Sequence, residues 1–521
     1  MNRILALTRP DVARRFPSLL PLAGIVIAGV ALRFYHIGEK SLWLDESFSV
    51  WMGAQPIREM LHALVRLDQH PPLYYALLHL WMAFGDSEVV VRGFSVLWSA
   101  LTLPVVYLIG VRIGGGGLGL LAALVLALAP LHLRDAQDAR MYALLTFNAS
   151  MALLCGVALL EADRHQERER EMSRFPALGS RPRWWLGLVV FTTLTMLSHN
   201  TAILFAAALG IFIAGAFGMP ALLRRLRRGA GPPDVRLRSW ALALGVALLL
   251  WLPWLPGFLV QSRRVYEEFW ILPPTWRNVL STWQDFCGTF EPGDQFKTPV
   301  LVAFGLLALL GAWRLRRKPA LLGLLLLLIL TPFAGEWLVS LLRPIYYTRT
   351  LVWTSIPFYL LLGAGLLQLR FRPLIGAAVL ALALLGGRSV DAYYRSGDQE
   401  GWRAAAAWLA PQVQPGDLML FNAGWVQIPF DYYYRRAGPP VDLHGLPADL
   451  FDRGILEPKM SIADIERLNT LIAGRRRVWL VYSHNLYTDP QNIIPRVLGA
   501  ALNETGQQEF SGLKIYGYVR E

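Results

Sequence analysis

The chain has 521 residues, of which 55% are hydrophobic and 17% are charged, and it contains 19 tryptophans. A soluble globular chain rarely carries so much apolar sequence, so we expect most of this chain to lie in a membrane. The formal net charge of +13 does not indicate nucleic-acid binding, because the basic residues fall in short clusters between apolar stretches.

Apolar runs long enough to cross a hydrocarbon core, about 20 residues, recur through the first three quarters of the sequence. We predict about eleven transmembrane helices. They cover residues 17–35, 88–111, 117–132, 141–160, 184–199, 201–219, 239–258, 298–314, 320–341, 350–369 and 373–389.

The arginines predict the orientation, since short cytoplasmic loops are enriched in Lys and Arg. With strict alternation through eleven spans, every basic cluster falls on the side of the N-terminus, which we therefore place in the cytoplasm. These clusters are Arg3 to Arg15, the segment 164–183, Arg224 to Arg228, Arg314 to Lys318, and Arg370 with Arg372. The outer side then receives residues 36–87, 133–140, 259–297, 342–349 and everything after 390.

From Asp391 the composition changes to a soluble pattern. Apolar runs at 418–421, 478–482 and 514–519 predict strands, and 462–473 predicts a helix. We therefore expect an all-α polytopic membrane domain over 1–390, with a large outer loop at 36–87, followed by a small extracytoplasmic α/β domain over 391–521.

Asp45 and Glu46 follow the first span, where a helix leaving the membrane places them at headgroup level. Ionisable groups at membrane depth are costly and mark functional sites. A carboxylate there can act as a general base on an acceptor hydroxyl, because partial burial raises its pKa toward the working range. The alternative is a solvated acidic pair that caps a loop helix.

His70 precedes Pro71 and Pro72, a pair that ends one element and suits the first turn of the next helix. This spacing places His70 and Asp68 at a helix start. Helix N-termini favour anions, so the position suits a phosphate to which His70 donates. A Pro-Pro turn with His70 as a simple cap is the alternative.

Asp138, Arg140 and Tyr142 occupy the short outer turn before the fourth span. Arg140 can neutralise a phosphate and Tyr142 can orient it. An Asp-Arg interface pair, with Tyr142 in the aromatic belt, is the alternative. In the next outer turn, His199 together with a carboxylate could hold a divalent metal, although one histidine also fits a simple interfacial role.

Arg343, Tyr347 and Arg349 lie in a very short outer loop between two apolar spans. Two arginines there are well placed for a phosphate or diphosphate headgroup. The alternative is that they extend to the phosphates of ordinary membrane lipids.

The elements Leu44-Asp45-Glu46, His70-Pro71-Pro72-Leu73-Tyr74-Tyr75 and Ala136 to Tyr142 together resemble the GT-C membrane glycosyltransferases. The similarity is to the protein mannosyltransferase and aminoarabinose transferase branch, especially to bacterial members such as the rhizobial galacturonosyltransferases. It covers roughly residues 17–390, and the order and common side of the motifs make it specific.

The resemblance implies a lipid-phosphosugar-dependent glycosyltransferase of the bacterial inner membrane that modifies lipopolysaccharide or another glycan. It would move a sugar, with inversion, from a polyprenyl-phosphate donor to an unknown glycan, lipid or protein acceptor on the outer face. By position, Asp45 is the base or acceptor-orienting carboxylate with Glu46 beside it. His70, Arg140 and Arg349 hold the donor phosphate, with Tyr142, Arg343 and Tyr347 around it.

One departure concerns metal binding. The aminoarabinose branch has Glu-Lys before its Pro-Pro, where this chain has Gln69-His70, and the nearest acid is Asp68. The family glutamate therefore has no counterpart, and metal dependence stays open. Asp68, Asp138 and His199 are the candidates for holding a metal or supporting the substrate-binding groups.

Two other classes of protein share several of these features. A polytopic transporter or lipid flippase also has many spans with polar groups near the membrane, but this sequence lacks paired repeat halves and its polar candidates gather on one face. A non-catalytic scaffold that presents the C-terminal domain is the third class. Substitution of Asp45 separates them, because only a transferase should lose transfer while its folding stays intact.

Overall fold

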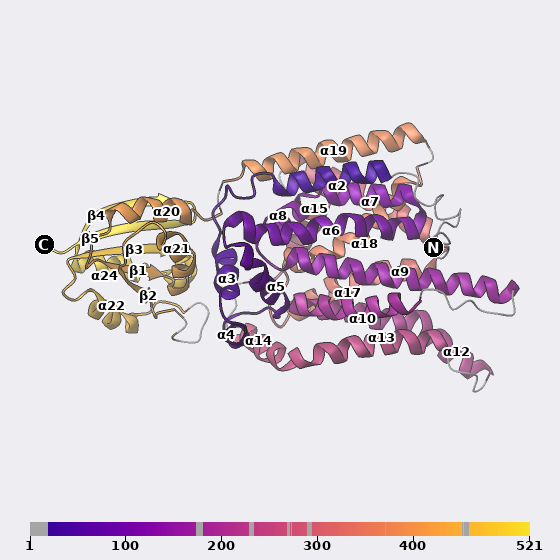
Figure 1. Cartoon of the computed structure of the whole chain (residues 1–521), viewed down its shortest axis with the longest axis horizontal. Coiled ribbons are helices and arrows are strands. Elements are labelled where there is room, and N and C mark those ends of the chain that lie inside the picture. The colour runs from indigo at the N-terminus through magenta and orange to yellow at the C-terminus, as the bar shows by residue number, and fades with distance from the viewer. Residues whose placement is uncertain are drawn as a thin grey trace, which may run out of the picture. The chain divides into compact units, whose positions relative to one another are not determined.

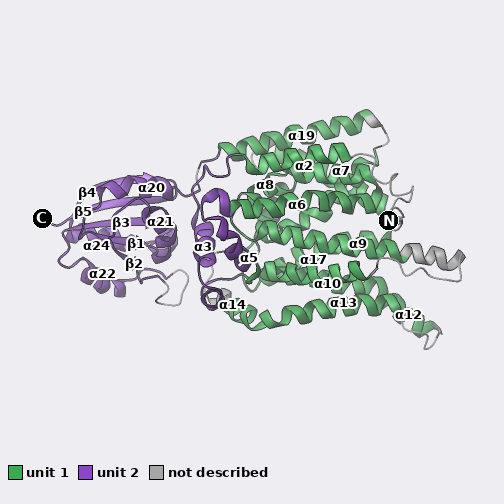
Figure 2. Cartoon of the chain, viewed as in Figure 1, with its two compact units in different colours: residues 1–35, 70–74, 92–395 green, residues 36–69, 75–91, 396–521 purple. Residues whose placement is uncertain are grey.

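The computed structural model describes residues 19–172, 181–228, 234–267, 271, 273–288, 294–369, 371–397, 399–450, 452 and 458–521. The chain divides into two compact units, which are described separately. Unit 1 comprises residues 1–35, 70–74 and 92–395, and unit 2 comprises residues 36–69, 75–91 and 396–521 (Figure 2).

Unit 1 is a bundle of α-helices, several of which run alongside one another for most of their length (Figure 1). Its helices are α2 (Leu19–Phe34), α6 (Glu88–Gly114), α7 (Gly116–Leu128), α8 (Pro130–Ala136), α9 (Tyr142–Met172), α10 (Arg181–Ser198), α11 (Ile203–Ile213), α12 (Met219–Arg228), α13 (Val235–Trp251), α14 (Leu255–Glu267), α15 (Trp276–Phe286), α16 (Asp294–Leu315), α17 (Pro319–Ser340), α18 (Ser355–Leu366) and α19 (Arg372–Arg395). Short helical segments join some of them: η3 (Asn200–Ala202), η4 (Ala214–Gly218), η5 (Leu252–Trp254) and η6 (Thr348–Thr354).

The predicted count of eleven membrane spans is not confirmed. Within the described residues, seven helical segments are long and apolar enough to cross a membrane, and the count rises to eight if α7 and α8, which meet at a bend of 63°, form one broken span. The predicted spans that are not among these segments correspond to α2, of which 16 residues are described, to α10, with 18 residues, and to α18, with 12. The predicted class, a polytopic helical membrane protein, is confirmed.

Glycines allow some helices of unit 1 to approach one another closely. A Cβ atom on Gly365 of α18 would lie 1.9 Å from the carbonyl oxygen of Leu307 in α16. A Cβ atom on Gly311 would lie 1.9 Å from the carbonyl oxygen of Leu361. Small residues at helix interfaces are the usual way in which membrane helices gain packing contacts, because lipid offers no hydrophobic driving force between them.

Unit 2 contains a five-stranded sheet of order β2-β1-β3-β5-β4. The strands are β1 (Leu418–Asn422), β2 (Asp442–Leu446), β3 (Arg477–Ser483), β4 (Asn503–Phe510) and β5 (Leu513–Val519). β1 pairs in parallel with β2 and β3, whereas β5 pairs antiparallel with β3 and β4. Leu418, Leu420, Val478 and Leu480 are fully buried. The predicted α/β domain is confirmed, and its sheet has two strands, β2 and β4, in addition to the three predicted.

Helices α20 (Trp402–Leu409), α21 (Gln427–Tyr434), α22 (Ile465–Ile472), α23 (Asn485–Thr488) and α24 (Ile493–Ala501), with the 3₁₀ segments η7 (Ala410–Gln412), η8 (Gly424–Val426) and η9 (Ile462–Asp464), complete the C-terminal part of unit 2. The N-terminal part contributes α3 (Leu44–Gly53), α4 (Ile57–Leu67), α5 (Leu73–Trp81) and η2 (Met82–Phe84).

Hydrogen bonds fasten the segment before α3 to the C-terminal part of unit 2. Arg403 donates to Glu88 at 2.6 Å and to the carbonyl oxygens of Gly38 and Glu39, each at 2.9 Å. The Leu42 N–H donates to the Tyr433 hydroxyl at 2.7 Å, and that hydroxyl donates to Glu88 at 3.0 Å. The loop that carries Asp45 is therefore built into the same unit as the sheet.

Candidate active site

Asp45 and Glu46 lie in the first turn of α3, with Trp43 as the N-cap residue. Carboxylates are favoured there, because the unsatisfied N–H groups of a helix N-terminus carry partial positive charge. Glu46 is 1% exposed, and its Oε2 accepts the Trp43 N–H at 3.3 Å. Asp45 is only partly buried. The first turn of α3 thus fixes two neighbouring carboxylates, of which Asp45 is the more accessible.

Two residues that sequence reasoning missed lie against this turn within unit 2. The Leu44 N–H donates to Oε2 of Glu400 at 2.8 Å, and the Nε2 atom of His484 lies 3.5 Å from Oε1 of Glu400. Burial, together with the negative charges of Asp45 and Glu46, raises the pKa of Glu400 to about 7. Burial lowers the pKa of His484, an effect that the charge of Asp45 opposes. No sequence motif identifies Glu400 or His484 as part of this site. Glu400 is 356 positions from Leu44, and only the fold brings the two residues together.

Unit 1 brings several of the other predicted residues together. Arg140 lies in the turn between α8 and α9, where its N–H donates to the Asp138 carbonyl oxygen at 2.7 Å. Its Nη2 atom lies 3.4 Å from Nδ1 of His70. Gln261 of α14 donates to the His70 carbonyl oxygen at 3.1 Å, which holds the residue just before the Pro-Pro turn. α5 begins at Leu73, directly after that turn, as the prolines predict.

Arg349 of η6 forms an ion pair with Asp138, with 2.9 Å between Nη1 and Oδ2. The Cζ atom of Arg349 also lies 5.8 Å from the centroid of the Tyr142 ring, within the range of a cation–π contact. The turn before α9 and the connection after α17 therefore meet through Asp138, Tyr142 and Arg349. Asp138, one of the candidate metal ligands, thus forms an ion pair with Arg349.

His199 joins the same group from the turn after α10. Its ring centroid lies 5.0 Å from that of His70 and 6.0 Å from that of Tyr142. The Nδ1 atom accepts the Thr201 N–H at 3.2 Å, so the neutral imidazole carries its proton on Nε2. We call His70, Arg140, Tyr142, His199 and Arg349 the cation cluster of unit 1.

The remaining predicted residues have separate places. Asp68 is buried in unit 2, where it is the C-cap residue of α4. Tyr347 is the N-cap residue of η6, and Arg343 lies earlier in the same connection, partly buried. Among the residues that the structure describes, no three His, Cys, Asp or Glu side chains are grouped to hold a metal ion. The candidate metal ligands Asp68, Asp138 and His199 do not form such a group.

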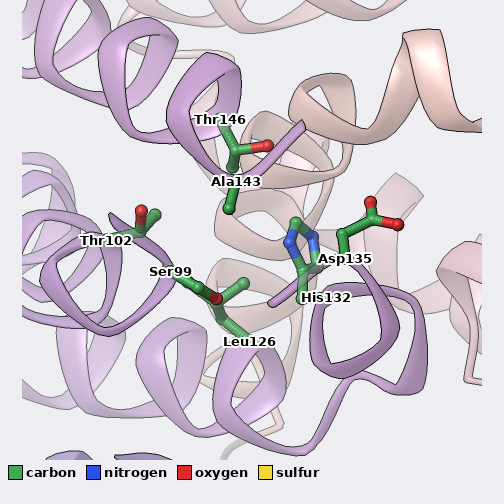
Figure 3. A pocket seen from close by; sticks show the side chains of 7 residues that line it. All are labelled: Ser99, Thr102, Leu126, His132, Asp135, Ala143 and Thr146. Carbon is green, nitrogen blue, oxygen red and sulfur yellow. The ribbon is translucent and has the colours of Figure 1, made fainter. Parts of the chain in front are cut away.

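A narrow cavity in unit 1 is lined by Ser99, Thr102, Leu126, His132, Asp135, Ala143 and Thr146 (Figure 3). Both carboxyl oxygens of Asp135 are buried without a hydrogen-bond partner, and Nε of Arg134 lies 3.5 Å from one of them. The cavity is too narrow for a water molecule. It is therefore a gap in the packing between α6, α7, α8 and α9 rather than a substrate pocket.

Comparisons with known proteins agree with the helical architecture. The model of a family described as dolichyl-phosphate-mannose-protein mannosyltransferase matches residues 69–168, which include His70, Asp138, Arg140 and Tyr142. No curated protein matches the chain.

Solved structures match over nearly the whole chain. The crystal structure of ArnT from Cupriavidus metallidurans bound to undecaprenyl phosphate is 16% identical and has a TM-score of 0.55; the match covers 95% of this chain and 97% of ArnT. The oligosaccharyltransferase of Archaeoglobus fulgidus in complex with Zn and sulfate is 12% identical, with coverage of 96% and 73% and a TM-score of 0.57. The Archaeoglobus fulgidus oligosaccharyltransferase AglB, in complex with an inhibitory peptide and a dolichol-phosphate, is 11% identical, with coverage of 96% and 74% and a TM-score of 0.56. At these identities the matches establish the fold.

Proposed function

We propose that this chain, which has the GT-C fold and resembles membrane glycosyltransferases of the protein mannosyltransferase and ArnT type, transfers a sugar from a polyprenyl-phosphate donor to an acceptor hydroxyl. The observation that carries the proposal is the cation cluster of unit 1. Its members come from four connections that are far apart in the sequence, yet they meet through contacts of 3.4 to 6.0 Å.

The chemistry of the donor explains why a cation cluster suits this reaction. A sugar linked to polyprenyl phosphate is a phosphodiester with one negative charge. When the bond between the anomeric carbon and the phosphate oxygen breaks, the leaving polyprenyl phosphate becomes a monoester and gains negative charge. Fixed cations that face this oxygen stabilise the transition state more than the ground state. Arg140 and Arg349 are the cations assigned to this role, with His70 and His199 as donors beside them.

Asp45 is the proposed general base. It takes the proton from the acceptor hydroxyl while the hydroxyl oxygen forms its bond to the anomeric carbon, and the phosphate leaves from the opposite face, which inverts that carbon. The phosphate is a good leaving group without protonation, so the reaction needs no separate general acid. The position of Asp45 in the first turn of α3, with partial exposure and Glu46 buried beside it, supports this assignment.

The proposal includes an outer-face reaction at a bacterial inner membrane. Nucleotide sugars are confined to the cytoplasm, so an outer-face transferase needs a lipid-linked donor. The connectivity of unit 1 is consistent with this. α10 runs from Arg181 to the turn at His199, and α17 runs from the basic stretch at Arg314 to Lys318 toward Arg349. Arg181 and His199 thus lie at opposite ends of α10, and the stretch 314–318 and Arg349 lie beyond opposite ends of α17, which supports the assignment of the cation cluster to the outer face.

Transfer itself tests the proposal. Purified protein is supplied with a radiolabelled undecaprenyl-phosphate sugar and with lipid and glycan acceptors extracted from outer membranes. We expect label to move to an acceptor with wild-type protein and with Glu59→Gln, a matched control for an exposed carboxylate of α4. We expect no transfer with Asp45→Asn. Translocation of the intact labelled lipid in vesicles without transfer would instead identify a flippase.

A further inference from the structure

Glu400 anchors the helix that carries Asp45. The N–H of Leu44, the first residue of α3, is one of the groups that a helix leaves unsatisfied at its N-terminus. It donates to Oε2 of Glu400 at 2.8 Å. The same oxygen accepts the indole N–H of Trp402 at 2.6 Å. Glu400 is 7% exposed and Trp402 is fully buried, so this carboxyl group is held in place from two sides.

The second oxygen of Glu400 faces His484. This histidine directly follows β3 in a left-handed backbone conformation, with φ of 54°. Its Nε2 atom lies 3.5 Å from Oε1 of Glu400, and its ring packs against Trp425, with 5.4 Å between ring centroids. The other ring nitrogen, Nδ1, lies 3.0 Å from the hydroxyl of Ser483.

The hydrogen-bond donors around His484 determine where a proton must be. The Ser483 hydroxyl donates to the Gly512 carbonyl oxygen at 2.7 Å, and a hydroxyl has only one proton to donate. The Ser483 oxygen therefore accepts from the Nδ1–H of His484. A neutral imidazole with its proton on Nδ1 has a lone pair on Nε2, which faces Oε1 of Glu400. The two facing atoms are thus both acceptors unless one proton lies between them.

We infer that Glu400 and His484 are positioning residues for Asp45: they share one proton, so that Glu400 anchors the first turn of α3 without adding a further negative charge beside Asp45 and Glu46. The inference rests on the proposed role of Asp45 as the base. It gives the C-terminal domain a part in the reaction, because Glu400 and His484 both belong to it.

The electrostatics of the pair agree with the geometry. Burial and the charges of Asp45 and Glu46 raise the pKa of Glu400 to about 7, and burial lowers the pKa of His484. Both directions favour a neutral carboxylic acid that donates to a neutral imidazole over an ion pair. The titratable groups facing Glu400 are Asp45 and Glu46 from α3 and His484 from the loop after β3.

The test compares Glu400→Gln with wild type across pH. A glutamine side chain accepts from Leu44 and Trp402 and donates to His484, as the protonated carboxyl does, but it cannot ionise. We expect the ratio of the two transfer rates, Glu400→Gln over wild type, to be near 1 at pH 6, where the wild-type carboxyl is protonated. The ratio should depart from 1 by threefold or more above the transition near pH 7. Glu59→Gln, the exposed control, should give a constant ratio.

His484→Asn supplies the second arm, since asparagine tolerates the left-handed conformation but offers no imidazole acceptor. The protonated carboxyl of Glu400 then loses the acceptor of its hydrogen bond, so its pKa falls. The pH at which the ratio of transfer rates departs from 1 should therefore move lower. Two results would overturn the inference. One is a ratio of transfer rates, Glu400→Gln over wild type, that stays constant from pH 5.5 to 8.5. The other is a transition in that ratio whose pH is unchanged in the His484→Asn background.

A readout without activity separates this inference from the proposed function. The melting temperature of the full-length protein is measured against pH for wild type and Glu400→Gln. If Asp45→Asn keeps full transfer activity, the proposed function fails. If instead the wild-type and Glu400→Gln melting curves have the same pH dependence between pH 5 and 8, the shared proton is absent, whatever the role of Asp45.

Discussion

Arg349 and Asp138 form a buried ion pair that joins two connections of unit 1 across 211 positions of the sequence. Their side chains are 9% and 5% exposed. Removing one partner of such a pair leaves the other charge buried and uncompensated, which costs about 3–5 kcal/mol. The pair therefore fixes Arg349 at the position where the proposed donor phosphate binds, in contact range of Tyr142.

Arg349→Ala and Asp138→Ala should each lower the melting temperature strongly, whereas the double variant should recover part of the loss, because neither charge is then left alone. Thermal unfolding of the four proteins in detergent measures this coupling. Strictly additive losses would show that the two residues do not act as a pair.

Arg140 gives a further test of donor binding, because its Nη2 lies 3.4 Å from Nδ1 of His70 within the cation cluster. Arg140→Gln should weaken binding of a polyprenyl-phosphate lipid about 10- to 100-fold, which corresponds to the loss of one charge-assisted hydrogen bond of about 1.5–3 kcal/mol. Microscale thermophoresis with undecaprenyl phosphate measures this affinity. Arg316→Gln, an exposed arginine between α16 and α17, is the control, and equal affinity of the two variants would contradict the assignment.

Glu400 should make the stability of the protein depend on pH. A carboxyl whose pKa is raised to about 7 in the folded state, from its ordinary value of 4.5, binds a proton in the folded state when the unfolded chain does not. Its stabilising contribution is thus fully present below the unfolded pKa and is lost as pH rises to about 7. The melting temperature should fall between pH 5 and 7, and Glu400→Gln should flatten that part of the curve. An identical fall in the variant would assign the effect to another group.

The close contact between α16 and α18 predicts that one methyl group added at Gly365 lowers the melting temperature. A Cβ atom at Gly365 would lie 1.9 Å from a backbone oxygen of α16, so Gly365→Ala must push the two helices apart. Gly305 of α16 has open space around its Cβ position, which makes Gly305→Ala the matched control. We expect Gly365→Ala to unfold at a temperature several degrees lower, and Gly305→Ala to equal or exceed wild type, since alanine favours helix. Equal melting of both variants would show that this interface is not tightly packed.

Much of the bundle follows from simple features of the sequence. The long apolar runs near 88–111, 141–160 and 320–341 became helices because their length and hydrophobicity leave no other structure for a chain in lipid. The sequence singles out His70, Arg140 and Arg349 because short connections between apolar spans confine polar residues to a thin layer, and their role in binding the donor stays a prediction. The count of eleven spans is not confirmed within the described residues, because α2, α10 and α18 are not among the long apolar helices and because α7 and α8 are separated by a bend.

Pairings between distant parts of the chain were beyond sequence reasoning. β4 carries the polar sequence Asn503 to Phe510 and is exposed along nearly its whole length, so no apolar alternation marks it. Glu400 and His484 carry no motif, and only the fold brings them to the first turn of α3. The partner of Asp138 was equally hidden, because an acidic residue in a turn fits a metal ligand, a cap or an ion pair until its neighbour is known.

The most direct measurement is the thermal stabilisation of the purified protein by a panel of undecaprenyl-phosphate sugars, compared among wild type, Asp45→Asn and Arg140→Gln. A ligand that binds only the folded state raises apparent stability by mass action. We predict that one donor stabilises wild type and Asp45→Asn alike, because Asp45 serves the acceptor, and that the stabilisation is lost in Arg140→Gln. No stabilisation by any donor, or equal stabilisation of Arg140→Gln, would contradict the proposal that the cation cluster of unit 1 binds a polyprenyl-phosphate sugar.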